Sequence, residues 1–305
     1  MKNNRSNSDR LLEFFEDKFE IDGSIAPPDE RIKRLAGLRY SQLAGEDRAR
    51  FDRFSVRVFE LSDYKQDEPY ELFFRLNQGS ALTPAEKRNT FYGPVRDQVR
   101  DLVALMDEKG LNIDRIGFNN NRLSYHDVIA RLLFALSMRM INKKITDSML
   151  VDFFRSGELV DEHVCSRAAK SIDSLSSIII RKVRLNKPTL LTWLLFFSCE
   201  NANSDLFNNF ESIKEDAKDG KCADRLLSFF AGIYQEKSSI SVNDAVPVQL
   251  RLLVIYLIGL LTHRINPTSP MSSSARNILK NFIALEHYSE EKLVDLMLAE
   301  EWGLK

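Results

Sequence analysis

A chain of 305 residues, 44% of them hydrophobic and 29% charged, can bury one large core or two modest ones. Its formal net charge of −1 excludes a protein that is basic throughout, so a contact with nucleic acid would need a local patch. Glycine, with 12 residues, and proline, with 9, are scarce, which favours helices over a fold rich in turns.

The first sixty residues predict a tail, a few helices and one strand. Residues 1–9 are polar, lack the apolar run of a secretory signal, and are expected to be disordered. Apolar residues at near-helical spacing over 11–19 predict a first helix, and shorter helices are expected at 29–36 and 46–51. Residues 54–58 alternate between apolar and polar side chains, which is typical of a half-buried strand.

The clearest helix start in the chain lies at Thr83. Threonine is a good N-cap residue, Pro84 has no N–H to leave unpaired in the first turn, and Glu86 stands where it completes a capping box. A tight turn is predicted at 77–80, before this helix, and a longer helix is expected over 95–108. The segment therefore predicts two helices joined by a polar turn, followed by a third.

The rest of the chain is a series of amphipathic or apolar stretches with short polar connections. The predicted helices cover residues 124–142, 146–155, 161–185, 188–199, 204–218, 221–235, 247–264, 273–285 and 289–301. The two most apolar runs, 190–198 and 252–261, are shorter than the ~20 residues of a membrane span, so we interpret them as core helices. No membrane partner is expected, and the fold is predicted to be mainly α with a boundary in the loop-like stretch 110–122.

The cysteines and histidines carry no pattern of a site. The three cysteines and four histidines are scattered along the chain, without a Cys-x-x-Cys pair or a His-Glu-x-x-His motif. We therefore expect neither a disulfide framework nor a metal site. This cysteine usage suits a reducing compartment, so a cytoplasmic protein is predicted.

A basic run marks the end of the helix predicted over 161–185. Arg181, Lys182, Arg184 and Lys187 are the best candidates for DNA binding in a nearly neutral chain. The alternative is a solvated helix end, which is the usual fate of a charge run. The sequence leaves both interpretations open.

The turn before Thr83 gathers polar groups that can hold a phosphate. The candidates for phosphate or nucleotide binding are Arg75, Asn77, Gly79, Glu86, Arg88 and Asn89. Two arginines beside the free N–H groups of a helix N-terminus provide an anion site. In the alternative, Glu86 only caps its helix, while Arg75 and Arg88 pair with carboxylates and lock the two helices together.

The same stretch resembles the signature of the GmrSD-type restriction endonucleases, a family related to SspE-like phage-defence proteins. The matching positions are Phe73, Arg75, Asn77, Gly79, Leu82, Glu86, Arg88 and Asn89. The segments LLEFFEDKF, LAGLRYSQL and FSVRVFEL resemble the family's flanking elements more loosely. The resemblance implies that residues 10–109 are part of an α+β domain similar to ParB and sulfiredoxin, with one or a few strands. A helical bundle domain is expected at 123–305.

This chain departs from the family where the family's chemistry lies. The nucleotide-hydrolysing site of the family is centred on an aspartate–glycine–glutamine–glutamine–arginine motif, and RSNSDR stands at that place here. The β-rich half of the domain and the His-Asn-His nuclease have no counterpart either, so we expect the chain to begin inside the domain. No catalytic residue is therefore assigned.

These sequence features leave three functional hypotheses. The resemblance favours a phage-defence protein of the restriction type that is associated with DNA and acts as a helical binding or scaffold component. The first alternative is one subunit of a split NTP-dependent DNA endonuclease, in which a partner chain supplies the missing half and an NTP with Mg²⁺ is the cofactor. The second is a helical interaction domain whose likeness to the family is coincidental. The purified chain is expected not to hydrolyse NTP.

Overall fold

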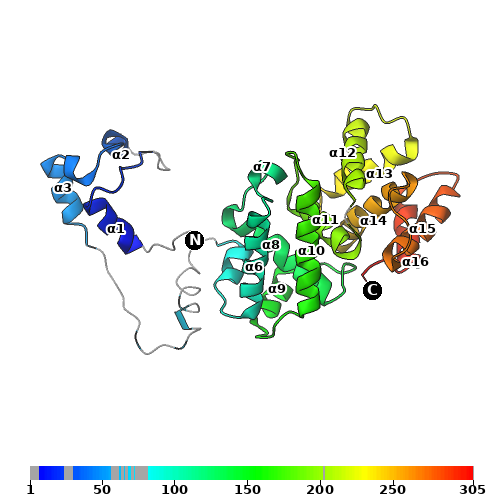
Figure 1. Cartoon of the computed structure of the whole chain (residues 1–305), viewed down its shortest axis with the longest axis horizontal. Helices are drawn as coiled ribbons and strands as arrows, with labels where there is room; N and C mark the ends of the chain where they lie inside the picture. The colour runs from blue at the N-terminus through cyan, green and yellow to red at the C-terminus, as the bar shows by residue number, and fades with distance from the viewer. Residues whose placement is uncertain are drawn as a thin grey trace. The chain divides into compact units, whose positions relative to one another are not determined.

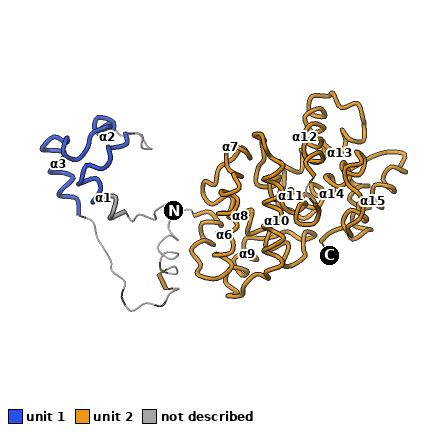
Figure 2. The backbone as a smooth tube through the Cα atoms, viewed as in Figure 1, with its two compact units in different colours: residues 1–62 blue, residues 63–305 orange. Residues whose placement is uncertain are grey.

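The computed structural model describes the chain in two compact units, residues 1–62 and 63–305 (Figure 2). The described residues are 7–23, 30–55, 62, 65, 68–69, 72, 82–201 and 203–304. They are mainly helical and include no strand, which confirms the prediction of a mainly α fold. The strand predicted at 54–58 lies largely outside the described residues, and Phe54 and Ser55, which are described, have no regular structure.

The first unit is a small group of short helices around an aromatic cluster. Its elements are α1 (Asn7–Phe15), α2 (Glu30–Leu35), the 3₁₀ helix η1 (Tyr40–Gln42) and α3 (Gly45–Asp52). Rings of Phe14, Phe15, Tyr40 and Phe51 pack with centroid separations between 4.8 and 5.9 Å. Edge-on contacts of this kind stabilise a small core beyond the area that they bury.

The second unit is a larger helical assembly. Its elements are α5 (Pro84–Asn89), α6 (Pro94–Glu108), α7 (Ile113–Ile116), the 3₁₀ helix η3 (Asn121–Leu123), α8 (Ser124–Ser137), α9 (Asp147–Arg155), α10 (Glu162–Ile178), α11 (Lys187–Cys199), α12 (Ser204–Lys218), α13 (Arg225–Lys237), α14 (Ala245–Leu261), α15 (Pro270–Ile283) and α16 (Glu290–Ala299). Helices α10 and α11 pack together between α6–α9 on one side and α12–α16 on the other (Figure 1).

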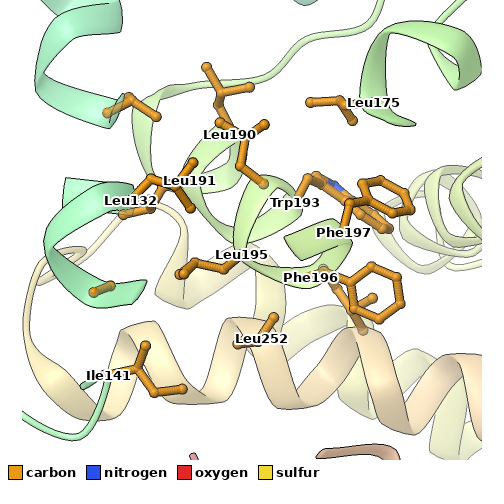
Figure 3. Close-up of a cluster of buried hydrophobic side chains, with 14 of the residues drawn as sticks. Leu132, Ile141, Leu175, Leu190, Leu191, Trp193, Leu195, Phe196, Phe197 and Leu252 are labelled. Carbon is orange, nitrogen blue, oxygen red and sulfur yellow. The ribbon is translucent and has the colours of Figure 1, made fainter. Parts of the chain in front are cut away.

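The core of this unit is built around α11 and α14, the two apolar runs of the sequence. Helix α11 contacts α8, α10 and α14, so it has no solvated face, and Trp193, Leu195, Phe196 and Phe197 are buried on different sides of it (Figure 3). A helix that is hydrophobic all round is stable in water only when neighbours cover it completely. No helix among the described residues is long and apolar enough to cross a membrane.

One charged side chain lies inside this core. Arg251, on α14, is 1% exposed and donates to the carbonyls of Lys237 at 2.6 Å and Val242 at 2.9 Å and to the hydroxyl of Thr192 at 3.1 Å. Burial lowers the pKa of its guanidinium to about 10, so that it is still charged at neutral pH. These three bonds connect the end of α13 and the following turn to α11 and α14.

Two predicted helices end earlier than expected. The helix predicted over 124–142 ends at Ser137, and the helix predicted over 161–185 ends at Ile178. Three consecutive isoleucines from Ile178 onward are β-branched and weaken the helical state. The residues that follow form backbone hydrogen bonds with another part of the unit instead, so Arg181, Lys182 and Arg184 lie on a connection, while Lys187 begins the next helix.

Candidate nucleic-acid interface

The helix start at Thr83 has the geometry that the sequence predicts. The N–H of Glu86 donates to the Thr83 hydroxyl at 3.2 Å, and the N–H of Thr83 donates to the Glu86 carboxylate at 2.7 Å, which completes the capping box. Arg122 adds an ion pair to the same carboxylate at 2.9 Å. The bonds from Arg122 and from the Thr83 backbone hold the pKa of Glu86 at about 2.

Arg88 is engaged in a network of charges that joins three helices. It is 1% exposed, and its two terminal nitrogens face the carboxylates of Asp127 on α8 and of Asp147 on α9, the latter at 3.3 Å. Arg131 pairs with the same two carboxylates, at 3.4 Å and 3.1 Å. Two arginines and two aspartates therefore alternate in this network, and they lock α5 against α8 and α9.

The remaining candidates for phosphate binding divide into two groups. The Asn89 amide oxygen accepts a hydrogen bond from Arg100 at 3.0 Å, so Glu86, Arg88 and Asn89 all bind protein groups. Arg75, Asn77 and Gly79 lie outside the described residues. Phosphate binding by this stretch stays a prediction.

The basic connection, residues 179–186, joins α10 to α11 and is held by backbone hydrogen bonds to α7. The N–H of Val183 donates to the carbonyl of Arg115 at 2.7 Å, and the N–H of Leu185 donates to that of Ile116 at 2.9 Å. Leu185 is buried and Val183 is half-buried. Lys182 and Arg184, which precede these two residues, are exposed.

A glycine allows the basic connection to lie this close to α7. Gly117 follows α7 with a φ of 87°, a conformation that L side chains rarely adopt. A Cβ at this position would lie 2.6 Å from the carbonyl oxygen of Val183 and 3.3 Å from the Cα of Arg184. The left-handed turn and the absent side chain together let the two segments meet.

Three of the four predicted DNA-binding cations come together on this connection. Arg181, Lys182 and Arg184 are exposed, and none of them forms an ion pair or a hydrogen bond with another described residue. The fourth, Lys187, starts α11 and lies 3.9 Å from the Asp127 carboxylate. The structure therefore separates a free cationic group at 181–184 from a cation that faces an acidic partner.

One further cation, which no sequence pattern singles out, lies beside this group. Arg115, on α7, donates to the carbonyls of Lys109 at 3.1 Å and Ser176 at 3.2 Å, and no described carboxylate lies within ion-pair distance of it. Its charge is therefore not neutralised and adds to the positive potential around the basic connection. The stretch 110–122 has a loop-like composition, and only the backbone pairing with Val183 and Leu185 reveals that Arg115 belongs here.

The described residues offer little for metal or thiol chemistry. They contain no group of three or more His, Cys, Asp or Glu side chains placed to hold a metal ion. All three cysteines are free, and burial raises the pKa of the Cys165 and Cys199 thiols, which disfavours the reactive thiolate. Burial, with the nearby charge of Arg100, lowers the pKa of His126 to about 4, so its imidazole is neutral at pH 7.

Comparison of the chain with protein-family models, with curated proteins and with solved structures finds no match. The likeness to the GmrSD-type endonucleases therefore depends on the sequence positions given above. The geometry around the basic connection is independent of that likeness, because its four cations lie outside the resembling residues.

Proposed function

We propose that this chain is a helical binding protein that contacts the phosphates of DNA through the basic connection. The observation that carries the proposal is the free state of Arg181, Lys182 and Arg184, three exposed cations on a segment whose backbone is fixed by hydrogen bonds to α7. A DNA duplex presents a regular row of phosphates, and cations that are not paired within the protein gain most from such a partner.

The expected mode of binding follows from the kind of groups present. Arginine and lysine contact phosphates without reading bases, so three such contacts give a sequence-independent and salt-dependent affinity. A protein with a net charge of −1 gains little from its overall field, and this local group must supply the attraction. The contact is therefore modest and depends on these three side chains.

The biological setting that we propose comes from the resemblance over residues 10–109. A protein similar to the GmrSD-type enzymes, but without their catalytic motif, fits a DNA-associated scaffold in phage defence. Its free cysteines fit the reducing cytoplasm. The second interpretation of the same resemblance is a split enzyme, in which a partner chain supplies the catalytic half. It is tested by measuring NTP hydrolysis with Mg²⁺ by the chain together with such a partner.

DNA binding is tested with a short labelled duplex, by fluorescence anisotropy over a range of salt concentrations. Changing Arg181, Lys182 and Arg184 together to alanine is expected to lower the slope of log affinity against log salt by about 3. At about 0.9 per phosphate contact, the loss of affinity caused by this change is about 40-fold larger at low salt than at a fourfold higher salt concentration. All three side chains are exposed, so the fold is expected to be unaffected.

A matched variant controls for total charge. Lys218 on α12 and Arg276 and Lys280 on α15 are also exposed, and their joint change to alanine alters the net charge by the same amount. We expect this control to bind DNA like the unmodified chain. Equal losses in both triple variants, or a loss in neither, would contradict a DNA contact at the basic connection.

A further inference from the structure

A groove opens on the second unit where the last turn of α8, helix α9 and the start of α10 meet. Its volume is about 500 Å³. The floor is apolar: the rings of Phe134 and Phe153 meet edge to face with centroids 5.4 Å apart, and Met138 and Met149 line the same space. Met138 is 51% exposed. Methionine side chains are flexible and adapt to different apolar partners, which makes them common on docking surfaces.

A leucine stands at the edge of the groove, on a connection that is held in place. Leu159 is 73% exposed and lines the groove. The next residue, Val160, is buried, and the Gln98 side chain binds both of its backbone groups, accepting from its N–H and donating to its carbonyl, each at 2.9 Å. These two hydrogen bonds fix the backbone next to Leu159, so the fold itself holds the Leu159 side chain in an exposed position.

The edge of the groove is acidic. Asp152, Glu158 and Asp161 line it and are exposed, whereas no lysine, arginine or histidine is among the described residues that line it. Asp161 caps α10 by accepting from the His163 N–H at 2.7 Å. Asp152 and Glu158 form no ion pair with any described residue. An apolar floor with two unneutralised carboxylates at its edge is thus open to solvent.

We propose that this groove binds a basic amphipathic helix of a partner protein. An apolar helix face inserts side chains between Leu159, Met138 and the floor, as in other helix-in-groove complexes. Lysine or arginine at the border of that face pairs with Asp152 and Glu158, and this charge complementarity selects a basic partner and repels an acidic one. The acidic edge favours a basic occupant, since an uncharged apolar ligand would form no ion pair with Asp152 and Glu158.

The groove and the basic connection lie at opposite ends of α10. The groove is lined by Val164 in the first turn of this helix, and the basic connection follows its last residue, Ile178. One helix therefore separates a surface for a basic partner from a surface for an anionic one. The proposal for the groove does not depend on DNA binding, because the two surfaces share no residue.

The test uses the full chain and two synthetic peptides. The first peptide contains only leucine and lysine, with the leucines on one helical face, and the second has glutamate in place of every lysine. We expect saturable binding of the lysine peptide in an anisotropy titration, and no binding of the glutamate peptide. Changing Asp152 and Glu158 together to lysine is expected to weaken binding by at least about tenfold, and Leu159→Ser by a similar factor.

A control variant separates the groove from bulk charge. Glu215 and Asp216 on α12 are exposed, and their joint change to lysine alters the net charge as much as the groove change does. This control is expected to bind the lysine peptide normally, as is the variant with alanine at 181, 182 and 184. Equal weakening in both charge-reversal variants, equal binding of the two peptides, or no binding of either would overturn the proposal.

Sedimentation of the chain without peptide tests whether a second copy of the chain occupies the groove instead of a separate partner. Self-association that disappears when Asp152 and Glu158 are changed to lysine would assign the groove to a second copy and overturn the proposal of a separate partner. Sedimentation as one species, unchanged by these substitutions, supports it.

Discussion

At the scale of single residues, the ion pairs that Arg88 forms and the phosphate contact predicted for it would compete for the same guanidinium nitrogens. Its guanidinium lies in the interior and faces Asp127 and Asp147. A phosphate would have to replace one of these carboxylates, and the displaced aspartate would then need another cation. Arg131 already contacts both aspartates, and Lys187 lies 3.9 Å from Asp127, so a displaced Asp127 has two further cations nearby, whereas Asp147 has only Arg131 among the described residues. The main role of Arg88 in this structure is therefore to hold α5 against α8 and α9 through these ion pairs.

Replacing Arg88 by leucine is expected to lower the free energy of unfolding by about 2–3 kcal/mol. Removing one partner of a buried pair leaves an uncompensated charge, and the half-exposed position of Asp147 moderates the effect. Arg122→Leu is the comparison variant, since Arg122 pairs with Glu86 at 57% exposure, where water screens the interaction, and a smaller loss is expected. Urea unfolding of both variants measures the difference. Equal losses would mean that the network around Arg88 contributes no more than a surface pair.

The capping carboxylate of Glu86 makes part of the stability depend on pH. Its pKa is about 2 in the folded chain, below the ordinary value of 4.5, because Arg122 and Thr83 stabilise the charged form. The charged form therefore stabilises the fold fully above about pH 4.5, and this contribution is lost as the pH falls from there toward 2. We expect Glu86→Gln to be less stable than the unmodified chain at neutral pH, with a difference that shrinks in acid. A difference that is constant with pH would contradict this assignment.

At the scale of elements, the meeting of α7 with the basic connection depends on Gly117. Gly117→Ala is expected to lower the free energy of unfolding by about 2–3 kcal/mol, from the left-handed backbone and from contact of the new Cβ with the Val183 carbonyl. Gly220→Ala is the matched control: its φ is 71°, but a Cβ there meets nothing within 4 Å, so only about 1 kcal/mol is expected. We also expect Gly117→Ala to shift the basic connection and to weaken the proposed binding of DNA, which the anisotropy titration measures. Identical losses for the two glycines would show that the close approach adds nothing.

Element starts could be predicted from the sequence, whereas tertiary partners could not. The cap at Thr83 is a local signal, and its hydroxyl forms the predicted bond to the N–H of the third helical residue, Glu86. The end of α10 is different, because it is decided by hydrogen bonds from Val183 and Leu185 to α7, more than sixty positions earlier in the chain. Propensity alone does not contain that information.

The partners of the candidate sites follow the same rule. Arg88 meets Asp127 and Asp147 across separations of 39 and 59 residues, so the sequence supplies the cation but not its carboxylates. It likewise supplies the charges of the basic run without showing that Lys187 faces Asp127 while the other three cations are free. The groove beside α9 has no sequence signature, since its floor and its acidic edge come from three helices and one connection.

At the scale of the whole molecule, the two units have cores of very different size. Among the described residues of the first unit, only Phe14 and Leu43 are buried hydrophobic side chains, whereas the second unit buries the great majority of the core. A unit of about sixty residues with so small a core is marginally stable. The chain is therefore expected to unfold in two steps, with the first unit losing its structure at a lower concentration of denaturant.

The tryptophans make this difference measurable in the intact chain. Trp193 and Trp302 are the only two in the sequence, and both are buried in the second unit, so tryptophan fluorescence reports on that unit alone. Circular dichroism reports on the helices of both units. We expect an early phase in the dichroism that the fluorescence lacks, and its disappearance when residues 1–62 are deleted. Because the basic connection and the acidic-edged groove both belong to the second unit, the deleted chain is also expected to retain binding of DNA and of the lysine peptide. Coincident transitions by the two probes would mean that the units unfold as one.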